Sequence, residues 1–262
     1  MCGRYVLVQK VETIEKRFNV KAPPTMAWEP RYNIAVGQLA PVISSDHPLQ
    51  LDLMTFGMTP HWATKPMYLF NARAEGDRNK ENNPAYSGAK DIIIKPAFRK
   101  SIRSKRCLVI ADAFIEGTTD EGLSNPFLVY LQNKERPFAM AGLFDEWENN
   151  KTGEILRSFS IITTTANDLM QKLPHHRMPV ILKREQEHLW LNLKMPLSDI
   201  TKIIRPYDSN LMNAYAICPQ IKSAKNDSKD LIVPKSERLN PEYKLRISKQ
   251  IKLQGMGRYR NT

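Results

Sequence analysis

One stretch near the middle of the chain decides the fold, and it reads Arg-Cys-Leu-Val-Ile-Ala-Asp-Ala-Phe-Ile-Glu at residues 106–116. Its part 107–111 is continuously apolar and contains β-branched residues, which is typical of a strand buried on both faces. We expect residues 114–116 to extend this strand. The Glu116 carboxylate then lies either at the exposed end of the strand or buried with a raised pKa, and the sequence leaves both readings open.

Further strand-like segments lie on both sides of this stretch. The segments that precede it are residues 3–9, 32–35, 40–44 and 51–58, and the polar run 76–90 between them and the stretch predicts an exposed loop. Three segments that follow it predict a strand meander, namely residues 126–132, 138–147 and 158–165. One more strand is expected at residues 178–182.

Helical patterns are fewer and lie between the strands. We expect helices at residues 10–19, after the N-cap residue Asn167 up to Pro174, and at 184–193, the last burying Leu189, Trp190 and Leu193. This order of elements predicts an α+β fold with a largely antiparallel β-barrel-like core and peripheral helices.

Composition narrows the class of protein. The 262 residues fit one large domain or one domain with an appendage. Because no apolar run approaches the length of a membrane span and no signal peptide is evident, we expect no membrane insertion and no secretion. The three cysteines are odd in number and far apart, which favours a reducing cytoplasm over a disulfide framework. No metal site is expected, since there is no Cys-x-x-Cys pair and the adjacent His175 and His176 would point opposite ways on an extended chain.

The charge of the chain favours polyanionic partners. Lys and Arg number 39 against 27 Asp and Glu, which gives +12 and points to nucleic acid first and anionic membrane second. Residues 221–262 are polar and basic with little periodicity, so we divide the chain into a main domain over 2–220 and a basic C-terminal extension over 221–262. A flexible basic tail explains part of the excess charge as well as a DNA-binding groove does.

The first residues, Met1-Cys2-Gly3-Arg4-Tyr5, carry a distinct chemistry. A small second residue permits removal of Met1, after which Cys2 presents an α-amine and a thiol on adjacent carbons. Such a 1,2-aminothiol condenses with an aldehyde, and the thiol then closes on the imine carbon to give a five-membered thiazolidine. A cysteine at position two can equally be chance.

Several other polar residues have a structural and a functional reading. Asn71 and Arg73 can form a turn with a solvated charge, His175 can be a satisfied core histidine, and Trp62 can pack on the surface. Taken singly, none of these residues decides the function.

Seven segments in order resemble the SOS response-associated peptidase (SRAP) family, and the resemblance spans residues 2–220. The segments are Cys-Gly-Arg-Tyr at 2–5, Arg-Tyr-Asn-Ile-Ala at 31–35, Asn-Ala-Arg-Ala-Glu at 71–75, the stretch at 106–116, Ala-Gly-Leu-Phe at 141–144, Ile-Ile-Thr-Thr-Thr-Ala-Asn at 161–167 and His-His-Arg-Met-Pro-Val-Ile-Leu at 175–182. The resemblance implies an SRAP-like fold and a sensor of abasic sites in single-stranded DNA. It also implies that the N-terminal cysteine forms a thiazolidine crosslink with the ring-opened sugar.

The resemblance implies a catalytic group without a cofactor. Cys2 matches the nucleophile, and Asn71 matches the residue that holds the Cys2 amine or the sugar hydroxyl. Glu116 matches the acid that moves protons during imine formation, and His175 matches the residue that opens the sugar ring.

The implied partner is single-stranded DNA containing abasic sites, bound by a monomer in the cytoplasm and at the nucleoid during DNA damage. Arg4, Arg73 and Arg177 are the expected phosphate ligands, and Trp62 is the expected aromatic platform for bases. The sequence departs from the family pattern at Gly117, where a Trp is usual. It also departs at Val36, where a Pro is usual, and in Phe-Gly-Met-Thr-Pro-His-Trp at 56–62, where Trp-Gly-Leu-Ile-Pro-x-Trp is usual.

Other functions use the same residues. A thiol peptidase or amidohydrolase would use Cys2 as nucleophile and His175 as base, and the family name reflects such a peptidase that removes its own Met1. Lyase activity at abasic sites is a further expectation, and a non-catalytic DNA-binding module is the third reading. A peptidase does not need its nucleophile at the N-terminus, whereas an aldehyde trap that uses the amine does.

Overall fold

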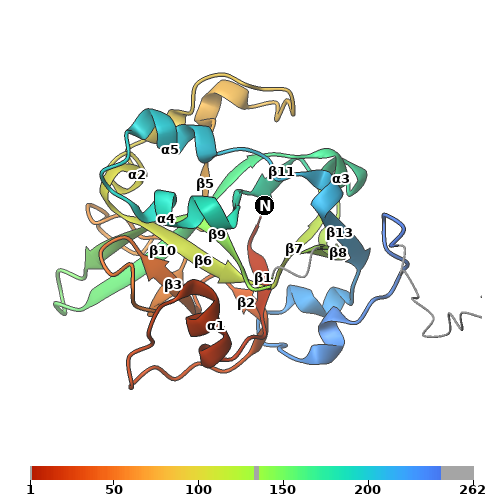
Figure 1. The fold of residues 1–262 in the computed structure, drawn as a ribbon, viewed down its shortest axis with the longest axis horizontal. Coiled ribbons are helices and arrows are strands. Elements are labelled where there is room, and N and C mark those ends of the chain that lie inside the picture. Colours follow the sequence, from red (N-terminus) through yellow and green to blue (C-terminus); the bar gives the residue numbers. More distant parts are fainter. Residues whose placement is uncertain (1, 133–135, 243–262) are drawn as a thin grey trace, which may run out of the picture.

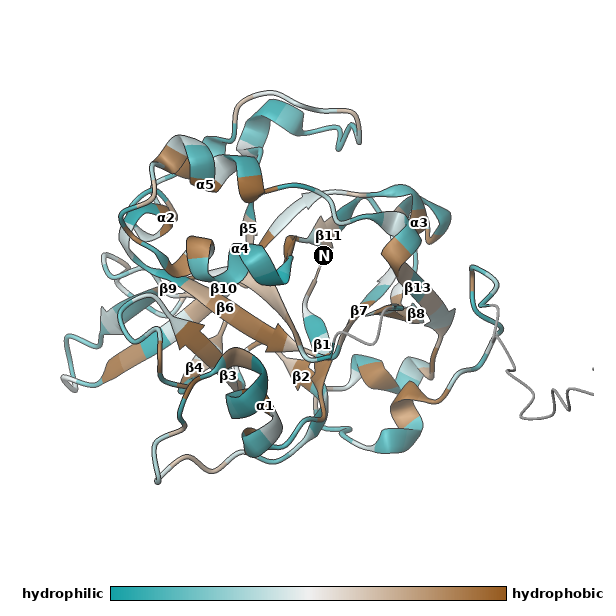
Figure 2. Cartoon of the chain, viewed as in Figure 1, coloured by the Kyte–Doolittle hydropathy of each residue, from teal (hydrophilic) through white to brown (hydrophobic). Residues whose placement is uncertain are grey.

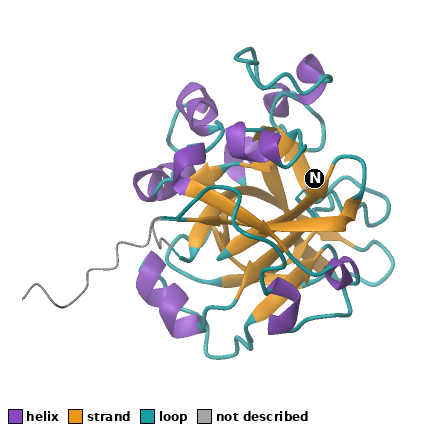
Figure 3. Ribbon diagram, turned by 90° about the vertical axis from the view of Figure 1, so that its right-hand side faces the viewer, coloured by secondary structure: helices purple, strands orange, loops and turns teal. Residues whose placement is uncertain are grey.

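The computed structural model describes residues 2–132 and 136–242. Two β-sheets cross in the centre and short helices surround them (Figures 1 and 3). The strands are β1 (Arg4–Leu7), β2 (Arg31–Ala35), β3 (Leu39–Ser44), β4 (Asp52–Phe56), β5 (Asn71–Arg73), β6 (Arg106–Ala111), β7 (Ala113–Thr118), β8 (Gly122–Leu131), β9 (Phe138–Glu148), β10 (Ile155–Thr165), β11 (Arg177–Pro179), β12 (Ile181–Leu182) and β13 (Met212–Ala216).

The helices are short and lie at the periphery. The α-helices are α1 (Val11–Phe18), α2 (Ser101–Ser104), α3 (Asp168–Lys172), α4 (Arg184–Leu191) and α5 (Leu197–Ile203). The 3₁₀-helices are η1 (Gly76–Asn79), η2 (Asp91–Ile93), η3 (Ser209–Leu211), η4 (Pro219–Lys222) and η5 (Lys229–Ile232). No helix in these described ranges is long and apolar enough to cross a membrane.

The larger sheet closes on itself. Its strand order is β11-β10-β4-β3-β6-β9-β12, and β10 also pairs with β9, so five strands from β10 through β4, β3 and β6 to β9 form a closed barrel. Among the named strands of the described residues, only the pairings of β10 with β4 and with β5 are parallel. The expected α+β fold with a largely antiparallel barrel-like core is therefore confirmed.

The second sheet has the order β13-β8-β7-β1-β2 and packs on the barrel. Aromatic rings join the two: Tyr5 of β1 meets Phe56 of β4 edge to face at 5.6 Å between ring centroids, and Phe56 stacks on Phe159 of β10 at 5.2 Å. Hydrophobic residues accordingly concentrate on the central strands, and hydrophilic residues on the surrounding loops (Figure 2).

The stretch 106–116 forms two strands and not the single one expected. β6 pairs with β3 and β9 in the barrel, whereas β7 pairs with β1 and β8 in the second sheet. Asp112 lies at the corner between them, and its carboxylate accepts hydrogen bonds from the Val8 backbone N–H at 2.7 Å and the Gln9 side chain at 3.0 Å. The chain stays buried through the corner, so the apolar pattern does not reveal the change of sheet.

Two other expectations need correction. The segment 126–132 does not begin a meander: β8 pairs with β7 and β13, and only β9 and β10 form the expected hairpin. The helix expected at residues 184–193 is α4, which ends at Leu191, so Leu193 lies outside the helix and is 43% exposed, while Trp190 is fully buried as expected. The expected N-cap at Asn167 is confirmed, because its side chain accepts a hydrogen bond from the Met170 N–H at 3.0 Å.

The first part of the basic extension lies against β2. The Asn33 side chain donates to the carbonyl oxygens of Ile221, Ser223 and Asn226 at 3.1, 2.9 and 2.8 Å. The Asp227 carboxylate accepts from the Asn33 N–H at 3.1 Å and pairs with Arg31. Residues 243–262 lie outside the described residues.

Candidate active site

Strand pairing brings Cys2 to the end of β7. In the β1–β7 ladder Arg4 lies opposite Ile115, so the residues before Arg4 run alongside Glu116 and beyond. Cys2 is 1% exposed and Glu116 2% exposed, which selects the buried reading for this carboxylate. Burial, together with the charge of Glu116 and a hydrogen bond to it, raises the pKa of the Cys2 thiol well above its ordinary value.

Asn71 reaches Cys2 from the other sheet. It opens β5, which pairs in parallel with β10, and its Nδ2 donates to the Cys2 carbonyl oxygen at 3.1 Å and to the Phe70 carbonyl at 2.9 Å. The Oδ1 atom is buried and has no hydrogen-bond partner among the described residues. A buried acceptor without a partner is costly, so this oxygen is suited to accept from an amine or a sugar hydroxyl.

His175 is held at the same place by its own loop. The Thr119 N–H and Oγ1 both donate to the Pro174 carbonyl, at 3.0 and 2.6 Å, which fixes the loop to the end of β7. The Nε2 atom of His175 lies 3.3 Å from Oε2 of Glu116, and Nδ1 lies 2.7 Å from the Arg177 carbonyl oxygen. Burial lowers the pKa of His175 below its ordinary value, against the opposing effect of Glu116.

This geometry fixes where one proton lies. A carbonyl oxygen only accepts, so Nδ1 of His175 carries a hydrogen and donates it to Arg177. In the neutral ring the other nitrogen, Nε2, carries no hydrogen, and it faces an oxygen of the Glu116 carboxylate at 3.3 Å. The Glu116–His175 pair can therefore take a proton from, and return one to, a group bound beside Cys2.

The three arginines expected to bind phosphate differ in their surroundings. Arg73 has its Nε and Nη2 atoms buried without a hydrogen-bond partner in the part of the chain that the structure describes. Among the described residues, Arg4 donates only to the carbonyl oxygens of Gly3 and Lys222, each at 3.1 Å, and burial lowers its pKa. Both have guanidinium charge that no carboxylate in the described ranges neutralises through an ion pair.

Arg177 is paired with Glu75, a residue that the sequence did not single out. Arg177 is buried, donates through Nη2 to the Thr163 carbonyl at 2.8 Å, and places Nη1 2.7 Å from Oε2 of Glu75. Although burial opposes ionisation, Arg177 holds the pKa of the fully buried Glu75 below its ordinary value. The sequence did contain a signal for Glu75, because this acid ends the segment Asn-Ala-Arg-Ala-Glu at 71–75, two residues after the short strand β5.

Glu75 has two further partners. Its Oε1 accepts a hydrogen bond from Thr164 Oγ1 at 3.0 Å and lies 3.4 Å from the Lys90 ammonium. One carboxylate therefore holds Arg177 and Lys90 together.

Trp62 lies apart from this group. Its side chain is 50% exposed and lines a cavity of about 300 Å³ together with His61, Pro96, Arg99 and Lys100. None of the four expected catalytic residues lines this cavity. An exposed indole beside two cations suits a nucleic-acid surface, and its role as a base platform stays a prediction.

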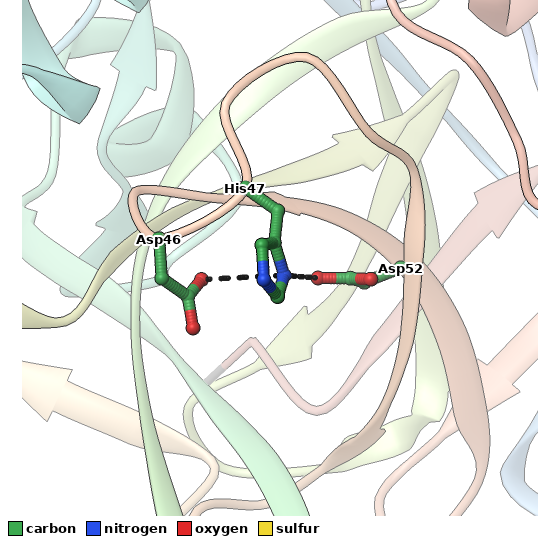
Figure 4. A group of neighbouring side chains, drawn as sticks. All are labelled: Asp46, His47 and Asp52. Atoms are coloured by element: carbon green, nitrogen blue, oxygen red, sulfur yellow. Dashed lines mark ion pairs between the residues drawn. The ribbon is translucent and has the colours of Figure 1, made fainter.

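One group of side chains in the described ranges has the donors of a metal site. Asp46, His47 and Asp52 gather at the β3–β4 turn, with Nδ1 of His47 3.5 Å from the Asp52 carboxylate (Figure 4). Arg157 already binds both carboxylates, at 2.8 Å to Asp46 and 3.1 Å to Asp52. The group is an ion-pair network of a surface turn, and we assign no metal to it.

Comparison with known proteins identifies the family. A family model described as SOS response associated peptidase (SRAP) matches residues 1–224. Among curated relatives, "Abasic site processing protein YoqW" of Bacillus subtilis (strain 168) is 35% identical over 239 residues, which cover 88% of this chain and 99% of that protein. "Abasic site processing protein HMCES" of Gallus gallus is 28% identical over 237 residues, covering 79% and 67%.

A solved structure agrees with the sequence relationship. A protein from Bacteroides thetaiotaomicron superimposes with a TM-score of 0.73 at 26% identity, covering 88% of this chain and 98% of that one. The residues that the family model matches, 1–224, include the strands that bring Cys2, Asn71, Glu116 and His175 together. The chain therefore belongs to the SOS response associated peptidase (SRAP) family.

Proposed function

We propose that this protein processes abasic sites in DNA, and that it does so by forming a covalent crosslink through Cys2. The first part is supported by the family and by the names of its curated relatives. The second part is supported by one arrangement: Cys2 is buried between the Asn71 amide, 3.1 Å from its carbonyl oxygen, and the Glu116–His175 pair.

The first step opens the sugar. An abasic deoxyribose is a hemiacetal in equilibrium with a free aldehyde. The Glu116–His175 pair accepts the proton of the anomeric hydroxyl and gives a proton to the ring oxygen as the ring C–O bond breaks, so the aldehyde forms with no net change in the protons of the pair. The unpartnered Oδ1 of Asn71 accepts from the sugar hydroxyl or from the attacking amine and orients it.

The next two steps join the aldehyde to Cys2 after Met1 has been removed. The amine attacks the carbonyl carbon, and the carbinolamine loses one water to give the imine. The Glu116–His175 pair takes the proton that the nitrogen releases and gives one to the leaving hydroxyl. The thiol sulfur then adds to the imine carbon, and the thiol proton passes to the nitrogen. The product contains new C–N and C–S bonds, and one water is released overall.

The raised pKa of Cys2 matters in the last step. Because burial and the charge of Glu116 keep the thiol protonated, the sulfur must release its proton as it attacks. Glu116, which is hydrogen-bonded to the thiol, can accept this proton and return it to the nitrogen. A thiol peptidase instead needs a thiolate at rest, which this environment disfavours. The electrostatics thus favour an aldehyde trap over peptide hydrolysis.

The DNA strand is bound by charge. Arg4 and Arg73, with guanidinium groups that no described carboxylate pairs, are the proposed phosphate ligands beside the lesion, and Trp62 is the proposed platform for an unstacked base. Such a surface prefers single strands, because stacking on protein needs bases released from their partners.

The test begins with an intact mass that establishes loss of Met1. The trimmed protein is then incubated, without borohydride, with a single-stranded oligonucleotide carrying one abasic site. We expect a product that survives a denaturing gel and has the mass of protein plus oligonucleotide minus one water. Cys2→Ala should give no such product, and Cys2→Ser should give only an imine that borohydride traps. Separate protein and DNA bands with the trimmed wild-type chain would contradict the proposal, as would retention of Met1.

A further inference from the structure

A cavity outside the candidate active site lies between the segment that follows η1 and the end of α5. Its volume is about 700 Å³, within the range of small-molecule sites. Its walls include Tyr86 and Lys90 on one side and Lys202 and Arg205 on the other, with Thr165 of β10 between them. Figure 1 shows the two walls as the amber segment and the blue-green helix α5 at the same edge of the molecule.

Two contacts connect this cavity to the proposed lesion site. Thr165 is the ladder partner of Arg177, because β10 pairs with β11 at this position. The Lys90 ammonium lies 3.4 Å from one oxygen of Glu75, and Arg177 lies 2.7 Å from the other. Two lining residues of the cavity, Thr165 and Lys90, are therefore linked to Arg177, the first by strand pairing and the second through Glu75.

The lining chemistry fits a nucleotide. Three cations line the cavity and no Asp or Glu is among its described lining residues, so the local charge favours a phosphate. Lys202 is partly neutralised by Asp199 at 2.7 Å, and Lys90 shares the Glu75 carboxylate with Arg177, so both lysines keep only part of their charge. Arg205 has no ion pair with a carboxylate of the described residues. The hydroxyl of Tyr86 donates to the Ala89 carbonyl at 2.9 Å and fixes the ring, and the Lys90 ammonium lies over one face of this ring at 5.9 Å from the centroid, which leaves the other face for a base.

We propose that this cavity is a subsite for the nucleotide adjacent to the lesion in the single strand, with its base against Tyr86 and its phosphate on Lys90 and Arg205. Base–aromatic stacking and a phosphate contact are the two interactions that single-strand binding proteins combine. The inference rests on the proposed function, since it takes the abasic strand as the ligand.

The test compares oligonucleotides that differ only in what flanks the lesion. One carries nucleotides on both sides of the abasic site, and two others lack all nucleotides on the 5′ or the 3′ side. Binding is measured by fluorescence anisotropy with Cys2→Ala protein, and crosslinking with the Cys2 protein gives the half-saturating concentration and the maximal rate separately. The variants are Lys90→Ala, Tyr86→Leu and Tyr86→Phe in each background.

The matched control is Lys151→Ala. Lys151 lies in the β9–β10 turn, at the opposite end of β10 from Thr165, about 33 Å away for an eleven-residue strand. The substitution Lys151→Ala removes one positive charge, as Lys90→Ala does, at a residue that does not line the cavity.

We expect Lys90→Ala and Tyr86→Leu to weaken binding of the fully flanked strand about tenfold, with the maximal crosslinking rate unchanged. Tyr86→Phe should bind like the parent, because it keeps the ring. One of the two truncated substrates lacks the nucleotide that would occupy the cavity. On that substrate Lys90→Ala and Tyr86→Leu should bind with the same affinity as the parent protein. Lys90→Ala should also reduce the slope of log affinity against log salt by about 0.7, the value for one phosphate contact on a single strand.

The subsite is overturned if both variants bind every substrate like Lys151→Ala, or if they weaken the flanked and both truncated substrates equally. The second result would mean that the substitutions act on the lesion site through Glu75 and Arg177. The absence of any crosslink with the trimmed wild-type chain would instead contradict the proposed function, and the anisotropy series with Cys2→Ala protein would still decide the subsite.

Discussion

The Nε2 atom of His175 lies 3.3 Å from Oε2 of Glu116, while Nδ1 of the same ring donates to the Arg177 carbonyl. The contact of Nδ1 fixes the tautomer of the neutral ring, and the contact of Nε2 places the carboxylate beside the nitrogen that takes up a proton. Because Glu116 also raises the pKa of Cys2, one carboxylate links His175 to the thiol. The predictions below follow from this arrangement and from the contacts that build it.

Replacing Glu116 by Gln should lower the pKa of the Cys2 thiol, because it removes the charge that opposes the thiolate, while burial still keeps the pKa above its ordinary value. The measurement is the pH dependence of Cys2 alkylation, resolved by peptide mass from the partly exposed Cys218. The control is Glu121→Gln, at an exposed position. An alkylation profile identical to that of the parent would remove Glu116 as a cause of the raised pKa.

Replacing His175 by Gln should slow crosslinking to an abasic oligonucleotide by about 100-fold or more, the usual contribution of a general acid–base group. The adjacent His176 is exposed, so His176→Gln serves as the matched control and should react at the parental rate. Single-turnover time courses on denaturing gels give both rates. Equal rates for the two variants would show that His175 has no role in proton transfer.

The stability of the protein should depend on the protonation of His175. Its native pKa lies below the ordinary value of 6.5, so between the native value and 6.5 the unfolded chain binds more protons than the folded one. The free energy of unfolding should therefore fall as the pH falls below 6.5, by at most about 1.4 kcal/mol per pH unit from this group.

Urea unfolding over the range from about pH 5 to pH 8 measures this dependence. His175→Gln should flatten the curve below pH 6.5, whereas His176→Gln should leave it as it is. A parent curve that rises on acidification through this window would have the wrong sign.

Gly117, where the family usually has Trp, has no room for a side chain. A Cβ at this position would lie 1.8 Å from the Gly122 carbonyl oxygen, at a point where the β7–β8 register shifts. We expect Gly117→Ala to cost about 3 kcal/mol of unfolding free energy or more, because backbone must move to admit it.

Gly122→Ala is the comparison for this substitution. Gly122 has a positive φ of +55° but nothing within 4 Å of its Cβ position, so alanine there should cost only about 1 kcal/mol. Equal losses in denaturant melts would show that the close approach at Gly117 relaxes without cost.

Asn33 should be needed to hold the segment that follows η4. Asn33→Ala leaves three backbone carbonyls without their donor, and we expect a loss of about 2–3 kcal/mol in unfolding free energy. The control is Asn226→Ala, which removes a single exposed hydrogen bond to the Gln220 carbonyl and should cost less than about 1 kcal/mol. A melting curve of Asn33→Ala that matches the control would contradict this role.

The sequence by itself determined the class of fold and most of the individual elements. Alternating and continuous apolar runs predicted strands at most of the right places, and the side chain of Asn167 predicted the start of α3. These features depend on neighbours within a few residues, so the local pattern contains them. The aminothiol chemistry of Cys2 is likewise inferred from its position in the chain, and it stays a prediction.

Only the tertiary structure decided how these elements meet. It separated β6 from β7 at Asp112, buried Glu116 beside His175, and gave Arg177 the partner Glu75, which the sequence had left unassigned. Local periodicity specifies which side chains face the core. The register between strands far apart in the chain, and the closure of β10 onto both β4 and β9, decide which of those side chains touch.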